Sequence, residues 1–179
     1  MKELSLHVLD VAQNSIRAEA DYIEILISEI GNERIFKITD NGCGMSEEMV
    51  KKVIDPFTTT RTTRRIGLGL PFLKMFAEQT GGRMEVKSKL GEGTVVESVF
   101  YTDNIDCMPL GDISGTMAII IQGLPENVNL VYKRIKDDKG FTLDTRELRA
   151  ILGEKISFAE PEIATWISEY IRENESTLS

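Results

Sequence analysis

Four short motifs contain the residue types that could bind a nucleotide. Asp40 begins the run Asp-Asn-Gly-Cys-Gly-Met, and residues 10–14 upstream of it read Asp-Val-Ala-Gln-Asn. Downstream, residues 67–70 read Gly-Leu-Gly-Leu and residues 91–94 read Gly-Glu-Gly-Thr. An isolated Asp-x-Gly-x-Gly run is more often a solvated turn than a ligand site. The four motifs in this order together indicate a nucleotide pocket.

Residues 3–18 are predicted to form the helix that presents the first motif. Leu4, Val8, Val11, Ala12 and Ser15 recur at helical spacing, and good helix formers follow them. Asp10, Asn14 and Arg17 are spaced i, i+4 and i+7, so they share a face distinct from the apolar one. The helix therefore presents these polar groups together.

A hairpin is predicted to place the second motif. Residues 22–28 and 35–39 are rich in isoleucine and flank the turn at residues 31–32, and the second strand ends at Asp40. Ser46 should cap a short helix. Residues 57–66 contain many Thr and Arg residues and little apolar surface, which favours a mobile lid.

The remaining motifs belong to a predicted helix and a second hairpin. Residues 70–80 form the helix, in which Pro71 is tolerated in the first turn, and a Gly-Gly pair ends it. Residues 84–87 and 94–100 are predicted strands around the turn at residues 90–93. The third motif thus opens a helix, and the fourth occupies a hairpin turn.

The character of the chain changes at residue 104, so we divide it into residues 1–103 and a C-terminal extension, 104–179. Residues 117–121 and 129–135 are expected to form two strands. Two helices should follow, with capping signals at Asp144 and Ser157. The last helix has an apolar stripe, which we expect to pack on the protein's own core rather than on another protein. The small size of this segment favours an appended layer over an independent unit.

Composition limits the functional class. The chain has 179 residues, 41% of them hydrophobic, with a net charge of -8 and a pI near 4.8. Such an acidic protein is not expected to bind nucleic acid or an anionic membrane. There is no apolar signal run, and the longest apolar stretch, residues 117–121, cannot span a membrane. A cytoplasmic location is expected, and Cys43 and Cys107 support neither a metal site nor a disulfide framework.

The ordered motifs resemble the GHKL superfamily of ATPases, which includes gyrase, the Hsp90 chaperones, histidine kinases and MutL. The resemblance covers residues 1–103 and is strongest to the catalytic ATP-binding domain of histidine kinases. The reason is that residues 55–61, Asp-Pro-Phe-Thr-Thr-Thr-Arg, are followed by a short basic stretch and then by residues 67–70. In those kinases this run is the segment before the lid, the lid itself and the second glycine motif. The resemblance implies a two-layer α/β (α+β) sandwich of the Bergerat type with a mixed, mostly antiparallel sheet. The strand-strand-helix-helix extension at residues 104–179 contains no recognised motif.

The resemblance also implies a role for each motif, with ATP and Mg²⁺ as ligands. Asp40 would accept a hydrogen bond from the adenine amino group, with Thr94 supporting it, and Asn14 would supply an oxygen to Mg²⁺. The turn beneath the base and the phosphate-binding helix start would be formed by Gly42, Gly44 and Met45 and by Gly67, Leu68, Gly69 and Leu70.

Asp10 lies where gyrase-like members carry a glutamate that activates water. An aspartate is one methylene shorter, and a general base must reach the proton that it takes. This departure therefore argues against a hydrolase more than against a phosphotransferase. Arg17 and Arg61 are the preferred phosphate-facing cations, with Arg64, Arg65 and Lys74 nearby. Neither a P-loop nor a dinucleotide fingerprint is present.

Three functions remain open. The first is a histidine kinase-like domain that transfers phosphate in trans to a partner protein, because the only histidine, His7, lies inside the first helix. The second is a serine or threonine kinase resembling anti-sigma regulators. The third is an ATP-driven conformational switch with weak ATPase activity. A protein partner is expected in each case, and a homodimer is an additional possibility.

Overall fold

The computed structural model describes residues 3–57 and 69–179. In chain order the elements are α1 (Leu4–Arg17), β1 (Tyr22–Ile30), β2 (Glu33–Asp40), α2 (Glu47–Val53), α3 (Gly69–Gln79), β3 (Arg83–Lys89), β4 (Gly93–Tyr101), α4 (Ile113–Gln122), β5 (Asn129–Lys136), β6 (Lys139–Asp144), α5 (Thr145–Leu152) and α6 (Pro161–Ser176). The predicted lid at residues 57–66 lies outside the described residues, apart from Phe57.

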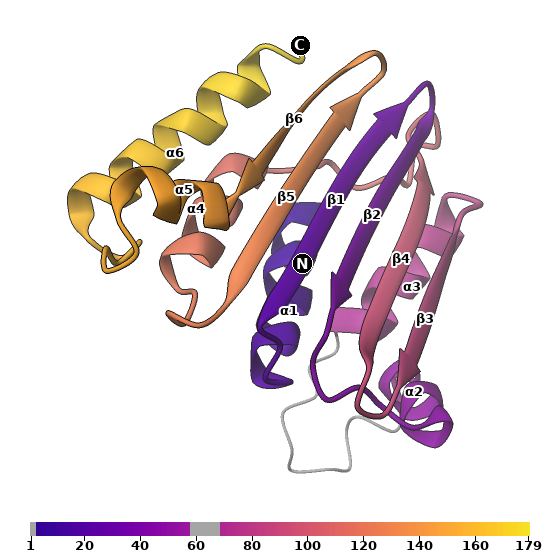
Figure 1. Cartoon of the computed structure of the whole chain (residues 1–179). Helices are drawn as coiled ribbons and strands as arrows, with labels where there is room; N and C mark the ends of the chain where they lie inside the picture. The colour runs from indigo at the N-terminus through magenta and orange to yellow at the C-terminus, as the bar shows by residue number, and fades with distance from the viewer. Residues whose placement is uncertain (1–2, 58–68) are drawn as a thin grey trace.

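The described strands form one mixed sheet in the order β3-β4-β2-β1-β5-β6 (Figure 1). Neighbouring strands are antiparallel except β1 and β5, which are parallel. The chain passes from β4 to β5 through α4 and so crosses to the far side of β1, beside which β5 lies parallel. The expected mixed, mostly antiparallel sheet is confirmed, and strands from beyond residue 104 complete it.

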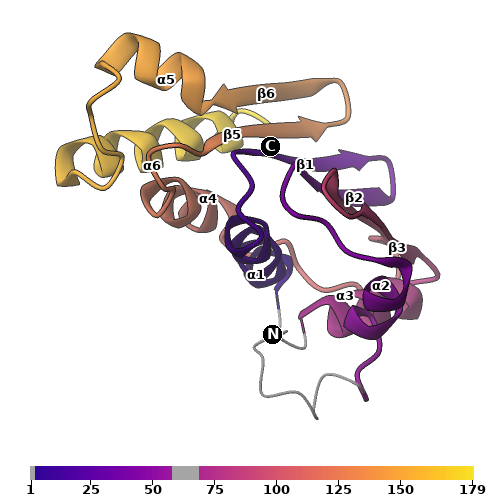
Figure 2. The same ribbon diagram turned by 60° about the horizontal axis from the view of Figure 1, so that its bottom comes forward.

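Helices α1, α3, α4 and α6 lie on one side of this sheet, with α1 between α3 and α4 (Figure 2). Strand β1 alternates, and its Ile23, Ile25 and Ile27 side chains are fully buried against this layer. The last helix, α6, packs on α4 and buries Ile167 and Ile171. The expectation that its apolar stripe meets the protein's own core is confirmed for most of the stripe, whereas Trp166 remains 43% exposed. The fold is the two-layer α/β sandwich expected from the sequence.

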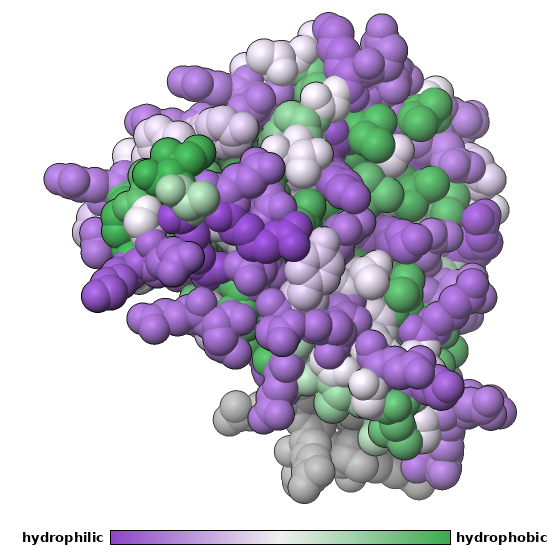
Figure 3. Space-filling view, viewed as in Figure 1, coloured by the Kyte–Doolittle hydropathy of each residue, from purple (hydrophilic) through white to green (hydrophobic). Residues whose placement is uncertain are grey.

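The opposite face of the sheet is largely polar, with scattered apolar residues (Figure 3). Lys133 on β5 lies 3.2 Å from the carboxylate of Glu24 on β1, and Lys37 on β2 lies 3.9 Å from that of Glu97 on β4. Cross-strand pairs of opposite charge suit a solvated sheet face. Within residues 3–57 and 69–179, no helix is both long and apolar enough to span a membrane.

The strand predicted at residues 117–121 is wrong, because these residues lie in α4. Asp112 caps this helix by accepting a hydrogen bond from the Gly115 amide at 2.9 Å. The run Met-Ala-Ile-Ile-Ile is apolar on nearly all sides, and periodicity cannot distinguish such a buried helix from a buried strand. Packing against α1 on one side and α6 on the other selects the helix.

Two further details of the extension differ from the prediction. Strand β6 was not expected, because it is a short edge strand containing Gly140 and exposed lysine. The cap of the last helix is Glu160 rather than Ser157, whose hydroxyl instead accepts the Ala159 amide at 3.1 Å. The Asp144 cap is confirmed and accepts the amide of Arg146 at 2.9 Å.

A buried ionic cluster joins α6 to the sheet. Arg134 on β5 is 3% exposed and pairs with Glu29 of β1 at 2.5 Å and with Glu175 of α6 at 3.2 Å. Burial alone would raise the pKa of Glu29, but Arg34 and Arg134 hold it below its usual value. The hydroxyl of Tyr132 donates to Glu175 at 2.9 Å. The C-terminal helix is therefore held by charge as well as by apolar packing.

Candidate functional site

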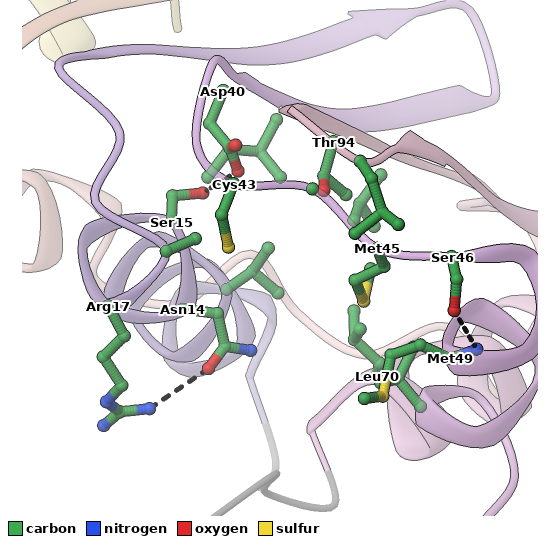
Figure 4. Close-up of a pocket in the computed structure, with 17 residues that line it drawn as sticks. Asn14, Ser15, Arg17, Asp40, Cys43, Met45, Ser46, Met49, Leu70 and Thr94 are labelled. Atoms are coloured by element: carbon green, nitrogen blue, oxygen red, sulfur yellow. Dashed lines mark hydrogen bonds between the residues drawn. The ribbon is translucent and has the colours of Figure 1, made fainter. Parts of the chain in front are cut away.

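A cavity of about 450 Å³ opens between α1, α2 and the ends of β2 and β4. Figure 4 shows its principal side chains. Small-molecule pockets commonly range from about 300 to 1,000 Å³ and combine an apolar wall with a few polar groups. This cavity has that character, since Val11, Ile38, Val53 and Val96 line it together with Asp40 and other polar residues.

Helix α1 contributes the first polar group of residues. Asn14, Ser15 and Arg17 line the cavity; Asn14 and Arg17 belong to the predicted polar face, whereas Asp10, the third residue of that face, does not line it. The Arg17 guanidinium donates to the Asn14 amide oxygen at 3.1 Å (Figure 4). An amide oxygen has two acceptor sites, so this contact leaves one available.

Asp40 lies at the end of β2, and its carboxylate is held from two sides. Ser15 of α1 donates its hydroxyl to one oxygen at 2.6 Å, and the Gly42 amide donates to the other at 2.9 Å. An ionised carboxylate only accepts hydrogen bonds and has about four acceptor sites. Each oxygen therefore retains a lone pair for a ligand, and the carboxylate orientation is fixed.

The turn after Asp40 is shaped by close backbone approaches. Gly44 has a φ of +69°, and a Cβ there would lie 2.0 Å from the Lys89 carbonyl oxygen. A Cβ at Gly42 would lie 2.7 Å from the Ala18 carbonyl oxygen. Glycine is thus required at both positions because a Cβ would collide with neighbouring protein backbone.

The β3–β4 hairpin closes the cavity opposite α1. Thr94 is the register partner of Asp40 on β2 and of Ser88 on β3. The Met45 amide donates to the Ser88 hydroxyl at 2.8 Å, and the Gly91 amide donates to the Cys43 carbonyl at 2.8 Å. These bonds fix the hairpin to the turn that follows Asp40.

Asp10 is on α1, lies behind the cavity and faces the start of α3. A Cβ on Gly69 would come within 1.8 Å of the Asp10 Oδ2 atom, so the two residues are in close contact. This buried oxygen has no hydrogen-bond partner among the described residues. Burial raises the pKa of Asp10, and the charge of Arg17 opposes the shift.

His7 is fully buried on α1 and packs edge to face against Phe76 of α3, with ring centroids 5.8 Å apart. Both ring nitrogens lack hydrogen-bond partners in the described part of the chain. Burial lowers the pKa of His7, so the neutral form is favoured. Its nitrogens are inaccessible to a phosphate donor in this structure.

Most predicted site residues within the described ranges line the cavity. The lining includes Asn14, Arg17, Asp40, Gly44, Met45, Leu70 and Thr94. Three predicted residues lie behind the lining: Asp10, Gly42 and Gly69. Gly42 donates its amide to the lining residue Asp40, and Gly69 contacts the Asp10 carboxylate. Arg61, Gly67 and Leu68 lie outside the described residues, as do Arg64 and Arg65.

Sequence reasoning missed several lining residues. Ser15 was assigned to the apolar face of α1, although its hydroxyl holds Asp40. Cys43 was not predicted as a site residue, but it is exposed and lines the cavity. Ser46, Met49 and Leu90 also contribute. The sequence did offer one signal for Ser15, because it directly follows the predicted site residue Asn14.

Comparison with known proteins yields one family model and several relatives. Residues 2–103 match the family described as histidine kinase-, DNA gyrase B-, and HSP90-like ATPase. A putative sensor protein of Shewanella frigidimarina (strain NCIMB 400) is 31% identical over 101 residues, covering 56% of this chain and 15% of the relative. Sensor protein SrrB of Staphylococcus aureus (strain NCTC 8325 / PS 47) is 35% identical over 99 residues, covering 52% of this chain and 17% of the relative.

The chain thus spans less than a fifth of the length of these relatives. The matched segment includes α1, the turn after Asp40 and the β3–β4 hairpin, which together enclose the cavity. Residues 2–103 form a histidine kinase-like ATP-binding domain, and the chain belongs to the histidine kinase-, DNA gyrase B- and HSP90-like ATPase family.

Proposed function

We propose that the cavity binds ATP with Mg²⁺ and that the protein transfers the γ-phosphate in trans to a partner protein. The observation that carries this proposal is the fixed Asp40 carboxylate, which keeps free acceptor sites at one wall of an apolar cavity. The exocyclic amino group of adenine is a matching donor. The apolar wall suits the faces of a purine ring.

The phosphate end of the site is assigned to α1 and the start of α3. Asn14 presents an amide oxygen to the cavity, and Mg²⁺ prefers oxygen ligands while keeping several positions for phosphate and water. Mg²⁺ bound there would neutralise phosphate charge. Arg17, now 3.1 Å from the same amide oxygen, is placed to contact phosphate when a nucleotide enters.

The position of Asp10 favours phosphotransfer over rapid hydrolysis. A general base must reach within hydrogen-bond distance of the proton that it takes. Asp10 does not line the cavity, and its buried oxygen faces Gly69. We therefore assign Asp10 to the support of the phosphate-binding segment, with slow hydrolysis of bound ATP as the consequence.

The phosphoacceptor is assigned to a partner because His7 is buried and is the only histidine in the sequence. The assay incubates the protein with γ-labelled ATP and Mg²⁺ in an extract of its source cells, beside Asp40→Asn as the inactive control. A labelled protein that appears only with the wild type supports transfer. Acid-labile label indicates a phosphohistidine acceptor, whereas acid-stable label indicates the serine or threonine kinase alternative.

A conformational switch is the second candidate, and one structural connection favours it. The amides of Leu4 and Ser5 at the start of α1 donate to the carbonyls of Pro109 and Leu110 at 3.0 and 2.9 Å. Helix α4 also packs against α1, which carries Asn14. Nucleotide-dependent movement of α1 would therefore reach residues 104–179. A protein that binds ATP but labels no other protein would support the switch and overturn the kinase proposal.

A further inference from the structure

Three side chains form a lateral polar row at the end of the covered face of the sheet. Ser88 on β3 pairs in register with Thr94 on β4, which pairs with Asp40 on β2. Thr94 and Asp40 line the cavity, whereas Ser88 lies behind Thr94 and does not. Ser88 can therefore act on a ligand only through its neighbours.

The hydrogen-bond partners of Ser88 determine where each hydroxyl hydrogen points. Ser88 Oγ lies 2.9 Å from the Gly93 carbonyl oxygen, which can only accept, so the single Ser88 hydrogen goes there. Ser88 Oγ also lies 2.8 Å from Thr94 Oγ1, and it accepts the Met45 amide at 2.8 Å. Because Ser88 has no second hydrogen, Thr94 must be the donor in that pair.

The orientation of Thr94 has a consequence for the cavity. With its hydrogen directed to Ser88, Thr94 Oγ1 offers only lone pairs to a ligand. The Asp40 carboxylate beside it also offers only acceptors. This wall of the cavity therefore favours a ligand group with two N–H hydrogens, such as the exocyclic amino group of a 6-aminopurine.

We propose that Ser88 is a positioning residue for base recognition, which makes Thr94 an acceptor and fixes the turn at Met45. This inference rests on the proposed function and deepens it. Asp40 takes one hydrogen of the 6-amino group, and Thr94 takes the other directly or through one water molecule. Removal of the Ser88 hydroxyl frees the Thr94 hydrogen to turn toward Asp40 or the ligand, where it competes with the amino group.

The test compares ATP with purine riboside triphosphate, which lacks only the exocyclic amino group. Binding of each nucleotide with Mg²⁺ is measured calorimetrically for the wild type, Ser88→Ala, Thr94→Val and the double variant. We expect Ser88→Ala to lower the ratio of the affinity for ATP to that for purine riboside triphosphate by about fivefold, which corresponds to one neutral hydrogen bond. When Thr94→Val is already present, adding Ser88→Ala should not lower this affinity ratio further.

Ser98→Ala provides the matched control. Ser98 lies in the same hairpin, is fully buried and donates to the Phe36 carbonyl at 3.3 Å, away from the cavity lining. The Ser98→Ala variant should have a lower melting temperature but the same ratio of affinities for the two nucleotides. Equal weakening of both nucleotides by Ser88→Ala, or no weakening, overturns the inference while ATP binding by the wild type stands. A wild type that binds neither nucleotide overturns the proposed function as well.

Discussion

Replacing Asp10 by Asn should make the protein more stable at neutral pH. The Oδ2 atom of Asp10 is buried against Gly69 and has no partner among the described residues. An ionised oxygen in this position loses its hydration without gaining a hydrogen bond. The amide of Asn keeps nearly the same shape and removes the charge.

The magnitude follows from the unpaired oxygen. A buried polar group without a partner destabilises a protein by about 1–3 kcal/mol, and Asn retains part of that penalty. We therefore expect a gain of about 1 kcal/mol in the free energy of unfolding. For a chain of this length, that gain corresponds to a rise of about 2–4 °C in melting temperature.

The gain should depend on pH in a defined direction. Burial raises the pKa of Asp10 in the folded state above its ordinary value of 3.8. Below that value the carboxyl is protonated in both states and causes no electrostatic penalty. As the pH rises through the unfolded and then the raised folded pKa, the folded state loses stability relative to the unfolded state. The advantage of Asp10→Asn should therefore appear above this window and shrink in acid.

The assay is thermal unfolding of the wild type and Asp10→Asn at pH 7.5 and near pH 3.5. Asp138→Asn, an exposed change in the β5–β6 turn, controls for the altered net charge and should change stability by no more than about 0.5 kcal/mol. Lower stability of Asp10→Asn at pH 7.5, or a gain of equal size in acid, would refute the account of a buried, unpaired carboxylate.

Three further predictions concern the buried cluster, the turn and the cavity cysteine. Arg134→Met should destabilise the fold by about 3 kcal/mol in denaturant unfolding because it removes the buried cation that Glu29 and Glu175 share, which leaves Glu29 with Arg34 and Glu175 with the Tyr132 hydroxyl; a loss below about 1 kcal/mol would contradict this. Gly91→Ala should lower stability by only about 1 kcal/mol, since its φ is +78° but no atom lies within 4 Å of the added Cβ. Gly44→Ala should lower it by at least twice as much and weaken ATP binding, and equal effects of the two changes would argue against the close approach at Gly44. ATP should slow the alkylation of Cys43, measured by mass spectrometry, because Cys43 lines the cavity. The alkylation rate of Cys107, whose pKa is raised by burial, should not depend on ATP. Alkylation of Cys43 at the same rate with and without saturating ATP would count against ATP binding in this cavity.

The sequence predicted most elements around the cavity because local patterns and tertiary packing agree there. The apolar spacing of Leu4, Val8 and Val11 predicts α1, and these side chains are buried as expected. The alternating isoleucines of β1 likewise identify the covered face of the sheet. Asp40 could be placed at a strand end because a glycine-rich turn follows it directly.

The extension was harder to predict because local propensity and tertiary packing disagree. Three consecutive isoleucines at residues 119–121 favour a strand, yet α4 forms because it packs between α1 and α6. The role of Ser15 depends on a contact with Asp40, 25 residues away in sequence. The acceptor role of Thr94 depends on the partners of Ser88, which no local pattern specifies.

The most direct test of the account is calorimetric titration of the wild type and Asp40→Asn with ATP and Mg²⁺. The asparagine side chain of this variant can still accept the Gly42 amide, so the fold should survive, but its amide nitrogen places a donor beside the adenine amino group. Loss of a hydrogen bond to a charged group predicts affinity lower by about 10- to 150-fold. Equal affinity of the folded variant and the wild type would contradict the claim that Asp40 binds the base.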